Sequence, residues 1–493
     1  MIKKTKIVIE TMINGGQVSS LILFFIFLIM SLFIGSSLFV TNYLNFQERK
    51  LNEIKALNIA ESGIEYYRWF LNHFPTDYTD GTNRPGPYVH PFTNRLGDRL
   101  GEFVLDVSPI TTGTYVAVIR STGKLSGLLP VEKTIRSTLG RQSIAKFAFL
   151  LDDNVRFGSG TTVYGEIHSN KGIRFDGIAY NWVKSSLLTY KDPDHAGCEE
   201  WAVHTHVFPV DPCPPTTLPQ RNDVFKVGRQ VGVQTADFVG ISASLSNLKN
   251  LAQDNGRYFG YSGDNNYGYE IIFKENNFDV YRVKSIIDQP RNCLIYDVHE
   301  SYGSNSRFKH STWSIKTKDY LGAYNYPSNG VIFVEDNVWL SGQIKNKKII
   351  VGAAIFPEQE SKMPNIIINN DLKYTFYDGS DSLGLIAQKN INIGLKSEDD
   401  LEIDGALLAQ NGRVGRYLYD SNCGQEYKRS KIRVFGSIIS RKRYGFSWVS
   451  GGTWVSGYNL REIFYDNNLL YYYPPYFPIA SEFYSTLLWE IEK

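Results

Sequence analysis

The feature that most constrains this chain is an uncharged run near its N-terminus. Residues Leu21–Val40 contain no Asp, Glu, Lys or Arg, and about 20 apolar residues are what an α-helix needs to cross a bilayer core of ~30 Å. The residues before the run are mainly basic, with Lys3, Lys4 and Lys6 against one acid, Glu10. Because cytoplasmic flanks are rich in Lys and Arg, the sequence predicts a single-pass membrane protein, N-terminus inside and body outside the cytoplasm.

A cleaved secretory signal also combines a basic start with an apolar stretch. Its apolar region is shorter, about 7–15 residues, and it ends at a small-residue cleavage site. The run in this chain is longer, and no Ala-x-Ala pattern follows it. A retained anchor is therefore the favoured interpretation, and removal of the whole segment is the alternative.

The apolar run is predicted to continue as one long helix. From Leu44 to Leu71, Leu and Ile recur at steps of three and seven with charged residues between them, which is typical of an amphipathic helix. A helix over residues 17–72 is roughly 80 Å long at about 1.5 Å per residue. Its second half must therefore pack on something outside the bilayer, before Pro75 and Pro85 break the pattern.

Three short stretches of alternating apolar and polar residues follow the helix. They are Phe103–Val107, Tyr115–Ile119 and Lys133–Thr138, and glycines separate them. This pattern predicts a three-stranded antiparallel meander. Because such a sheet has one apolar face to bury, residues 73–144 are expected to form a small antiparallel sheet against the amphipathic half of the helix.

Beyond Ala145 a loose repeat places Gly before a branched apolar residue and a polar corner. Its clearest copies lie at 164–170, 383–390, 404–411 and 435–440. Short apolar strands ending in Asn or Gly corners predict stacked rungs of a β-solenoid, and a β-sandwich of the same strands is the alternative.

The repeat divides the rest of the chain into two kinds of segment. The solenoid-like domain is expected over residues 145–180 and 326–493, and residues 181–325, which lack the repeat, are interpreted as an inserted α+β subdomain. Abundant Tyr, Phe and Gly suit strands and turns better than helices. The predicted fold class is therefore mainly β with a long N-terminal α-helix.

Charge and cysteine usage narrow the function classes. The net charge is +2, and basic and acidic residues are interspersed, so no nucleic-acid surface is expected. The four cysteines form no CxxC pair, and outside the cytoplasm they can form disulfides. Cys198 and Cys213 are the favoured pair because they are close together in a proline-rich stretch; free or differently paired thiols are the alternative.

One group of side chains has some character of a metal site. His195, His204 and His206 lie near Cys198 and Cys213 in the sequence, and zinc requires three or four converging ligands of these types. The spacing matches no zinc motif, and a Cys198–Cys213 disulfide would remove two ligands. The sequence analysis therefore predicts no metal site here.

Catalytic chemistry is not expected either. The acidic residues between Glu398 and Asp404 lack the Asp-x-Asp-x-Asn-Gly pattern of a calcium loop, and no spacing singles out a carboxylate pair for sugar hydrolysis. Gly-x-Ser-x-Gly, Walker-type and dinucleotide motifs are also missing from the sequence. We expect a protein that is not an enzyme, with no catalytic residue and no cofactor.

Two motifs resemble type IV prepilins and pseudopilins. The residues Gly15-Gly16-Gln17-Val18-Ser19-Ser20, between a basic leader and the apolar helix, resemble a prepilin processing signal. The stretch ALNIAESGIE over residues 56–65 is similar to the end of the N-terminal helix in PilX-like minor pilins. The body from Val155 to Glu490 is similar to large bacterial proteins with that same start, which implies a surface or pilus context without assigning chemistry.

The resemblance implies a processing route and partners. Prepilin peptidase would cut after Gly16, so that residues 1–16 are a leader and Gln17 becomes an N-methylated first residue. The helix would then associate with the membrane and with other pilin or pseudopilin subunits.

One position departs from the family pattern. Pilins of the fibre shaft carry a glutamate five residues into the mature chain, where it pairs with the N-terminal amine of a neighbour; in an apolar bundle an unpaired charge is costly. Counting from Gln17 places Leu21 at that position. In this respect the chain looks like minor subunits that cap a fibre tip, and the departure argues against membership of the shaft.

Two functional hypotheses follow. The first is a minor pilin-like subunit of a type IV pilus or related secretion filament, at the tip or in assembly priming, which displays a β-rich domain at the surface. The second is a membrane-tethered protein that binds or acts on surface polysaccharide, since Trp448, Trp454, Tyr471 and Tyr476 are aromatic side chains that can stack on glycans.

Overall fold

The computed structural model describes residues 2–110, 113–127, 131–238, 241–297, 311–450 and 452–492, with side chains of residues 2–17 and 241–244 outside the description. The chain forms two compact units. The first contains Met1–Ser108, Val118–Ser137 and Leu488–Lys493, and the second contains Pro109–Ala117 and Thr138–Leu487.

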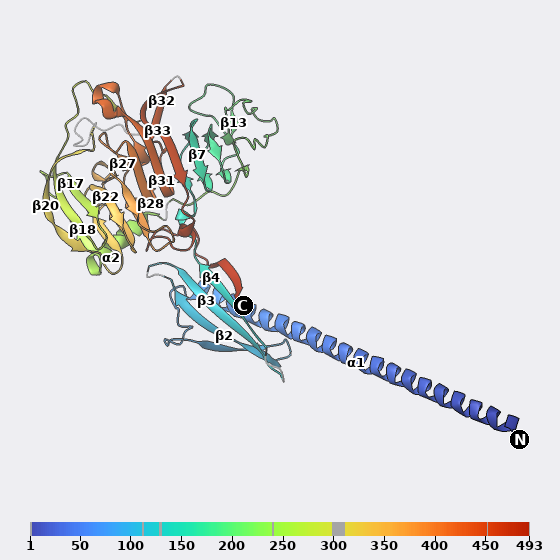
Figure 1. The fold of residues 1–493 in the computed structure, drawn as a ribbon. Helices are drawn as coiled ribbons and strands as arrows, with labels where there is room; N and C mark the ends of the chain where they lie inside the picture. Colours follow the sequence, from blue (N-terminus) through green and yellow to red (C-terminus); the bar gives the residue numbers. More distant parts are fainter. Residues whose placement is uncertain are drawn as a thin grey trace. The chain divides into compact units, whose positions relative to one another are not determined.

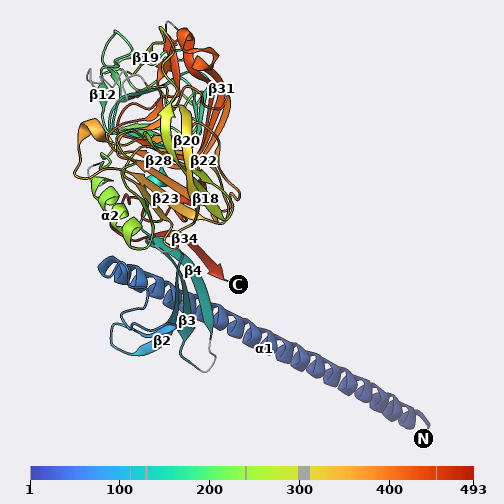
Figure 2. The same ribbon diagram turned by 90° about the vertical axis from the view of Figure 1, so that its left-hand side faces the viewer.

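The first unit combines the long helix with an antiparallel sheet. Helix α1 covers Ile2–His73, and the sheet has the strand order β1-β2-β3-β4-β34. Figures 1 and 2 show α1 crossing the sheet and continuing well beyond it. The strand bounds are β1 Tyr88–Thr93, β2 Arg99–Pro109, β3 Val116–Leu125, β4 Glu132–Gly140 and β34 Ser485–Glu492. A single helix followed by a sheet was predicted, and the long helix with mainly β structure is confirmed.

The second half of α1 is held on the sheet by close packing of small residues. Ala56 and Ala60 are fully buried, and a Cβ added to Gly123 in β3 would lie 2.1 Å from the Ala56 carbonyl oxygen. On the helix itself, a Cβ at Gly63 would lie 2.2 Å from Ser121 Oγ. Larger side chains complete the buried face: Ile59, Ile64, Tyr67, Phe70 and Leu71. Of the Leu and Ile positions that predicted an amphipathic helix, Ile64 and Leu71 lie in this interface, whereas Leu44, Leu51 and Ile54 are exposed, since the helix packs closely on the sheet only from Ala56 onward.

Strand β34 departs from the predicted domain boundary. The Gly repeat predicts that all of residues 326–493 belong to the solenoid, yet β34 pairs with β4 in the first sheet. Ser137 Oγ donates to the Leu488 carbonyl oxygen at 3.0 Å, and Arg136 Nη1 lies 2.8 Å from Glu490 Oε1. The edge of β4 offers unpaired backbone groups, and β34 satisfies them with a segment distant in sequence, which local pattern does not reveal.

The second unit is built from parallel strand ladders. The longest runs β16-β21-β23-β26-β28-β31-β5-β8-β11-β15. Its bounds are β16 Arg257–Phe259, β21 Val331–Val334, β23 Lys348–Ala353, β26 Ser382–Ala387, β28 Asp400–Ala409, β31 Lys428–Ser440, β5 Phe149–Leu151, β8 Ile167–Ser169, β11 Val183–Ser185 and β15 Arg229–Val231. Parallel, in-register stacking is the arrangement expected for a solenoid and unlike an antiparallel sandwich.

Three further parallel ladders form the other faces. One runs β17-β22-β24-β27-β29, another runs β22-β25-β28-β31-β33-β7-β10, and a short one joins β6, β9 and β14. Their remaining bounds are β17 Gly268–Phe273, β22 Val338–Ile344, β24 Ile366–Ile367, β25 Leu372–Tyr374, β27 Ile391–Ile393, β29 Val414–Arg416, β33 Thr453–Phe464, β7 Thr161–Tyr164, β10 Ile178–Ala179, β6 Val155–Phe157, β9 Ile173–Phe175 and β14 Val203–His204.

The corners between ladders depend on glycine. Gly405 in β28 and Gly436 in β31 pair with each other across the ladder, and both have positive φ, 145° and 150°. A Cβ on Gly436 would lie 2.0 Å from the Gly405 carbonyl oxygen. These two glycines let adjacent rungs turn in the same place, which is why the repeat carries Gly there.

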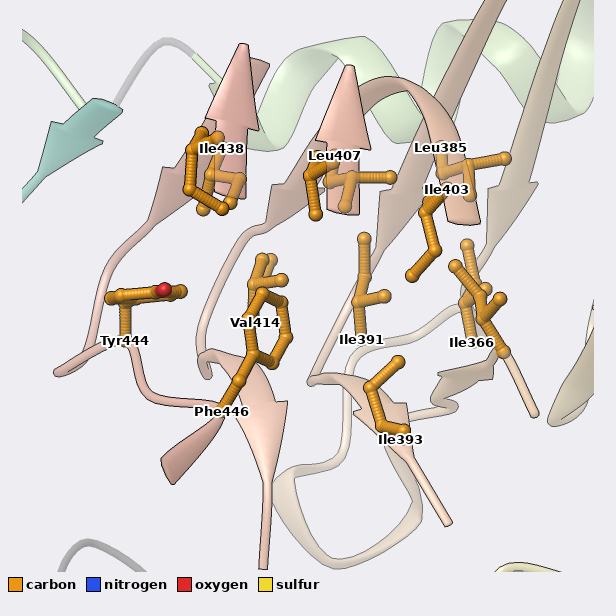
Figure 3. Packing of buried hydrophobic residues seen from close by; sticks show 14 of the residues in the cluster. Ile366, Leu385, Ile391, Ile393, Ile403, Leu407, Val414, Ile438, Tyr444 and Phe446 are labelled. Atoms are coloured by element: carbon orange, nitrogen blue, oxygen red, sulfur yellow. The ribbon is translucent and has the colours of Figure 1, made fainter. Parts of the chain in front are cut away.

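The solenoid core is a stack of apolar side chains that point inward from successive rungs. Figure 3 shows Leu385, Leu407 and Ile438 in a row, facing Ile391 and Val414 from the opposite side. All five are fully buried. Each rung buries its apolar face only against its neighbours, so the core is continuous along the stack.

Rung order along the stack differs from chain order. Strand β31, near the end of the chain, stacks directly on β5, with Ile438 paired to Phe149. Likewise β33 stacks on β7, with Ile463 paired to Val163. The early segment 149–231 and the later segment 257–464 therefore form one continuous stack, joined where chain-distant strands meet.

The predicted insertion, residues 181–325, does not stand apart from the solenoid. Strands β11 and β15 extend the long ladder at one end and β16 at the other, and β17 pairs in parallel with β22. Within this range β17 also forms an antiparallel hairpin with β18 (Asn277–Ile286), which pairs with β20 (Ile315–Asn325). These rungs lack the Gly repeat, so sequence periodicity did not mark them.

Shorter elements cover the ladders. Helix α2 (Ile241–Asp254) contributes Leu245 and Leu248 to a buried cluster with Val331 and Phe333. The remaining strands are β12 Thr189–Tyr190, β13 Glu200–Trp201, β19 Ile295–Tyr296, β30 Leu418–Tyr419 and β32 Ser447–Ser450. Strands β12 and β13 pair in a small hairpin, and the residues discussed as a metal group lie around it.

Candidate functional site

The first candidate site is the free apolar part of α1. In the described part of the chain, the helix Val18–His73 is long and apolar enough to cross a membrane. Side chains from Val18 to Val40 are open to the surroundings, including Phe33 at 75% exposed. By its length and composition, this row of exposed apolar side chains suits a lipid environment or contact with other apolar helices.

The few polar side chains in this segment are compatible with an apolar environment. Ser31 Oγ donates to the Leu28 carbonyl oxygen and Ser36 Oγ to that of Phe33, both at 2.9 Å. Thr41 Oγ1 donates to the Ser37 carbonyl oxygen at the same distance. Because these hydroxyls bond to their own helix, they add little to the cost of placing the helix in hydrocarbon.

Charged residues mark the end of the apolar part. Arg49 Nε lies 3.6 Å from Glu53 Oε1, one helical turn further on, and Lys50 Nζ lies 5.1 Å from the centre of the Phe46 ring. Glu53 Oε2 also faces Lys133 Nζ of the sheet at 3.5 Å. The helix therefore changes from an apolar to a charged surface where it begins to approach the sheet.

The residues predicted for processing, Gly16 and Gln17, lie within α1, just before its apolar part. The side chain of Gln17 lies outside the described residues. Cleavage after Gly16 stays a prediction. Leu21, at the position of the pilin glutamate, is 59% exposed. An apolar residue therefore lines the free helix surface at that position.

The second candidate site lies around the β12–β13 hairpin. Cys198 and Cys213 form a disulfide, as the favoured pairing expected, and Cys293 and Cys423 form a second one that was not predicted. His195, His204 and His206 come together beside the first disulfide, and the ring centres of His204 and His206 are 5.1 Å apart.

Two acids, Asp192 and Glu200, complete this group, and the sequence pattern did not point to them. The Glu200 carboxylate lies between all three histidines: Oε1 is 2.7 Å from His206 Nε2 and 3.3 Å from His195 Nδ1, and Oε2 is 2.8 Å from His204 Nε2. Asp192 Oδ2 lies 3.6 Å from His204 Nε2. We call Asp192, Glu200, His204 and His206 the histidine–carboxylate cluster. Glu200 and His204 stand four residues apart in the sequence, but this spacing is common and does not single out Glu200 as a partner.

The cluster is buried and charged. Its side chains are 2–12% exposed. Burial by itself would raise the pKa of Asp192, but His204, the Asp194 backbone N–H and Arg174 outweigh it and lower the pKa to about 2. Asp192 is therefore ionised at neutral pH, and the cluster holds a carboxylate charge away from solvent.

The acidic residues between Glu398 and Asp404 do not converge. Asp399 accepts hydrogen bonds from Ser430, whereas Asp404 accepts from the Tyr374 backbone N–H and the Tyr377 hydroxyl, both at 2.8 Å. Asp399 and Asp404 therefore have separate local partners, which gives these two carboxylates a structural role.

The aromatic residues considered for glycan stacking are partly packed in the body. Trp448 Nε1 donates to the Arg416 carbonyl oxygen at 2.9 Å, and Trp454 Nε1 donates to that of Ser456 at 3.0 Å. Tyr471 and Tyr476 are half-buried. These side chains do not form an open aromatic platform.

The fold and these surfaces define a class: a mainly β protein with one long, partly free N-terminal helix. No family model matches the sequence, and no curated protein matches it. Among solved structures, the chain is similar to the competence-associated pilin ComZ from Thermus thermophilus, at 14% sequence identity. The alignment covers 90% of this chain and 97% of that one, with a TM-score of 0.30. A likeness at this TM-score does not carry over what ComZ does.

Proposed function

We propose that this chain is a minor pilin-like structural subunit of a type IV pilus or related secretion filament. The observation that carries the proposal is the division of α1 into two environments. Its first part, from Val18 to Val40, is apolar and free, and its second part is packed on the β1–β4 sheet through Ala56, Ala60 and Gly63. One rigid element thus joins a folded domain to a surface suited to lipid or to a helix bundle.

The free part of the helix suits both of the environments that a pilin occupies. Its length from Val18 to Val40 is about 35 Å at about 1.5 Å per residue, enough to cross a ~30 Å hydrocarbon core. The same side chains can pack against other apolar helices when the subunit leaves the membrane. In this proposal the N-terminus faces the cytoplasm and the β-rich body lies outside it.

Position 21 supports a place at the tip or in priming. Leu21 brings no carboxylate to the apolar helix surface, so it cannot pair with the N-terminal amine of another subunit. A subunit that starts or caps a filament does not need that pairing on both sides. The large β-rich body would also crowd a repeating shaft.

The body is proposed to act by display and contact, without catalysis. The acidic residues near Asp404 and the aromatic residues near Trp448 are engaged in contacts within the fold. A screen of the purified full chain for polysaccharide binding and hydrolysis tests this part. Turnover of any glycan would contradict it.

Processing is tested by mass spectrometry of the N-terminus in cells that contain prepilin peptidase. Loss of 16 residues with an N-methylated Gln17 is expected, and an intact Met1 would contradict the pilin proposal. Gly16→Val should block the cut because prepilin peptidase cuts after glycine, whereas Gly15→Ala serves as the neighbouring control.

Filament association is tested by cross-linking from the free helix. A photoreactive amino acid at Phe33, whose side chain is 75% exposed, should give adducts with other pilin subunits in piliated cells. The control is the same probe at Leu96, which is 87% exposed in the loop before β2. Equal adduct patterns from the two positions would refute helix-mediated assembly.

A further inference from the structure

The histidine–carboxylate cluster has more acceptors than donors. Within the described part of the chain, Asp192 Oδ2, Glu200 Oε2 and His204 Nε2 are buried atoms without a hydrogen bond of acceptable geometry. His204 Nε2 and Glu200 Oε2 are 2.8 Å apart, so they are close but poorly aligned for a direct hydrogen bond. Buried polar atoms without partners are costly, and these three face one centre.

The hydrogen bond of His204 Nδ1 fixes which ring nitrogen faces that centre. His204 Nδ1 lies 3.1 Å from the Trp201 carbonyl oxygen, and since a carbonyl can only accept, Nδ1 carries the hydrogen. Nε2 is then directed toward Glu200 Oε2 and Asp192 Oδ2, at 2.8 and 3.6 Å. The two carboxylates require positive charge at this nitrogen, which either a proton or a bound metal ion supplies.

We propose that Asp192, Glu200, His204 and His206 bind a divalent transition-metal ion of the zinc class. One ligand atom from each of the four residues lies within 4.8 Å of the others. Ligands at about 2.0–2.2 Å from a tetrahedral zinc ion stand roughly 3.3–3.6 Å apart. The 3.6 Å between His204 Nε2 and Asp192 Oδ2 fits that spacing. The contacts of Glu200 with His204 and His206, 2.8 and 2.7 Å, are hydrogen-bond distances that must lengthen by about 0.6 Å when an ion enters.

The donor set selects the class of ion. Two imidazole nitrogens with two carboxylates suit zinc and its first-row neighbours better than calcium, which prefers six to eight oxygens. The bond from His204 Nδ1 to the Trp201 carbonyl is the outer contact that metal-binding histidines usually make, because it fixes the ring and its tautomer. The cysteines take no part, since both are in the disulfide.

Local structure holds the ligands in place. Glu200 lies in β13 and His204 in β14, and β14 pairs in parallel with β9 of the solenoid. The Asp192 Oδ1 atom accepts from the Asp194 backbone N–H at 2.9 Å, which leaves Oδ2 directed to the centre. Three ligands are thus attached to regular or hydrogen-bonded backbone.

The guanidinium group of Arg174 lies next to the proposed site. Arg174 Nη1 lies 3.6 Å from Asp192 Oδ2, so Arg174 competes for that oxygen, but its Nε is engaged by Asp176 at 2.8 Å. We therefore rank Asp192 as the weakest of the four ligands. His195, which is 43% exposed and 3.3 Å from Glu200, stands at the solvent side, where an ion would enter.

The ion would act as a structural crosslink. It would tie β13, β14 and the Asp192 turn together beside the Cys198–Cys213 disulfide, in a region with few long strands. Since small loop-rich segments bury little apolar surface, a metal and a disulfide are common substitutes for a core. This role is independent of the proposed filament function.

The test uses the full chain in detergent, stripped with a chelator and then titrated with Zn²⁺ and with Co²⁺. One ion per chain by elemental analysis is expected. Bound Co²⁺ should give the visible absorption of a four-coordinate nitrogen and oxygen site without a thiolate charge-transfer band. A thiolate band would overturn the ligand set, and no bound ion in the wild-type chain would overturn the proposal.

Paired variants identify the ligands. Glu200→Gln and His204→Gln should each weaken Zn²⁺ affinity by at least about 100-fold, since even outer-contact changes cost 10–100-fold. His168→Gln is the matched control, because His168 is also buried but lies outside the cluster and contacts Asn170; it should keep the wild-type affinity. Unchanged affinity in Glu200→Gln and His204→Gln would refute the assignment. If those variants do not fold, zinc-dependent protection of residues 189–206 from hydrogen exchange in the wild-type chain decides the question, and its absence counts against the site.

Discussion

Gly123→Ala tests whether the first unit depends on direct contact between α1 and the sheet. The added methyl group would lie 2.1 Å from the Ala56 carbonyl oxygen and 2.4 Å from the Ala60 backbone nitrogen. Both atoms belong to the helix backbone, so no flexible side chain can move away. Gly123 does not need positive φ, and the expected effect is therefore one of space alone.

The size of the effect follows from that geometry. A carbon and an oxygen that are not bonded normally stay about 3.3 Å apart or more, so the helix has to move away by roughly 1 Å. Such a movement loosens the contacts of Ala56, Ala60 and Ile59, all of which are buried. Overpacking of this kind costs about 1–3 kcal/mol.

Hydrogen exchange followed by mass spectrometry measures this cost locally, which suits a chain of two units better than a single melting curve. Amides in residues 56–71 and in β3 should exchange about 5- to 150-fold faster, the equivalent of about 1–3 kcal/mol. Lys124→Ala, at the next position of β3 with an exposed side chain, should leave exchange unchanged. Wild-type protection of the helix in Gly123→Ala would refute the close-packing argument.

Three further predictions concern the solenoid unit. Gly436→Ala should lower the melting temperature of this unit, because the added Cβ would lie 2.0 Å from the Gly405 carbonyl oxygen and the φ of Gly436 is 150°. Gly158→Ala is the control, because a Cβ at Gly158 meets open space. Equal melting temperatures of the two variants would contradict the need for glycine at the corner. Removing the Cys293–Cys423 disulfide, whose cysteines are 130 residues apart, should cost roughly 3–5 kcal/mol of unfolding free energy. Because a reductant would also open Cys198–Cys213, the measurement is denaturant unfolding of the double variant Cys293→Ser, Cys423→Ser against the wild-type chain without reductant. Equal stability of the two would show that packing alone holds that region. Burial raises the pKa of Asp404 to about 6, against opposing hydrogen bonds from Tyr374 and Tyr377, so the folded state binds more protons than the unfolded state between pH 4 and 6. Stability should therefore fall as pH rises through that interval and level off above it. In thermal melts, Asp404→Asn should flatten this fall. An unaltered pH profile in that variant would show that Asp404 does not cause the fall.

Local sequence pattern was sufficient for features whose cause is local. The uncharged run from Leu21 to Val40 predicted a helix with an apolar surface. The Leu and Ile spacing up to Leu71 predicted that the helix continues, but it identified its packing face only toward the end, at Ile64 and Leu71, because Leu44, Leu51 and Ile54 are exposed. Stacked glycines such as Gly405 marked rung corners because the positive φ there favours Gly over other residues. In each case one short segment carries its own physical requirement.

The two carboxylates of the histidine–carboxylate cluster could not be identified from the sequence. In the sequence, His195, His204 and His206 lie near two cysteines, yet the cysteines are bonded to each other in a disulfide, and the fold places Asp192 and Glu200 beside the histidines. Carboxylates are common in loops, so their presence carried little information. Only the backbone path through β12 and β13 directs them inward.

By itself, the sequence determined the free apolar helix, its continuation into an amphipathic half and the mainly β composition of the body, because helix and strand periodicities are written in consecutive residues. Tertiary structure alone decided that β34 closes the first sheet and that β31 stacks on β5, as well as which acids face the histidines. These pairings join residues far apart in the chain. Backbone hydrogen bonding at a strand edge is nearly independent of side-chain identity, so many partners satisfy it equally well, and the packing of the whole chain selects one.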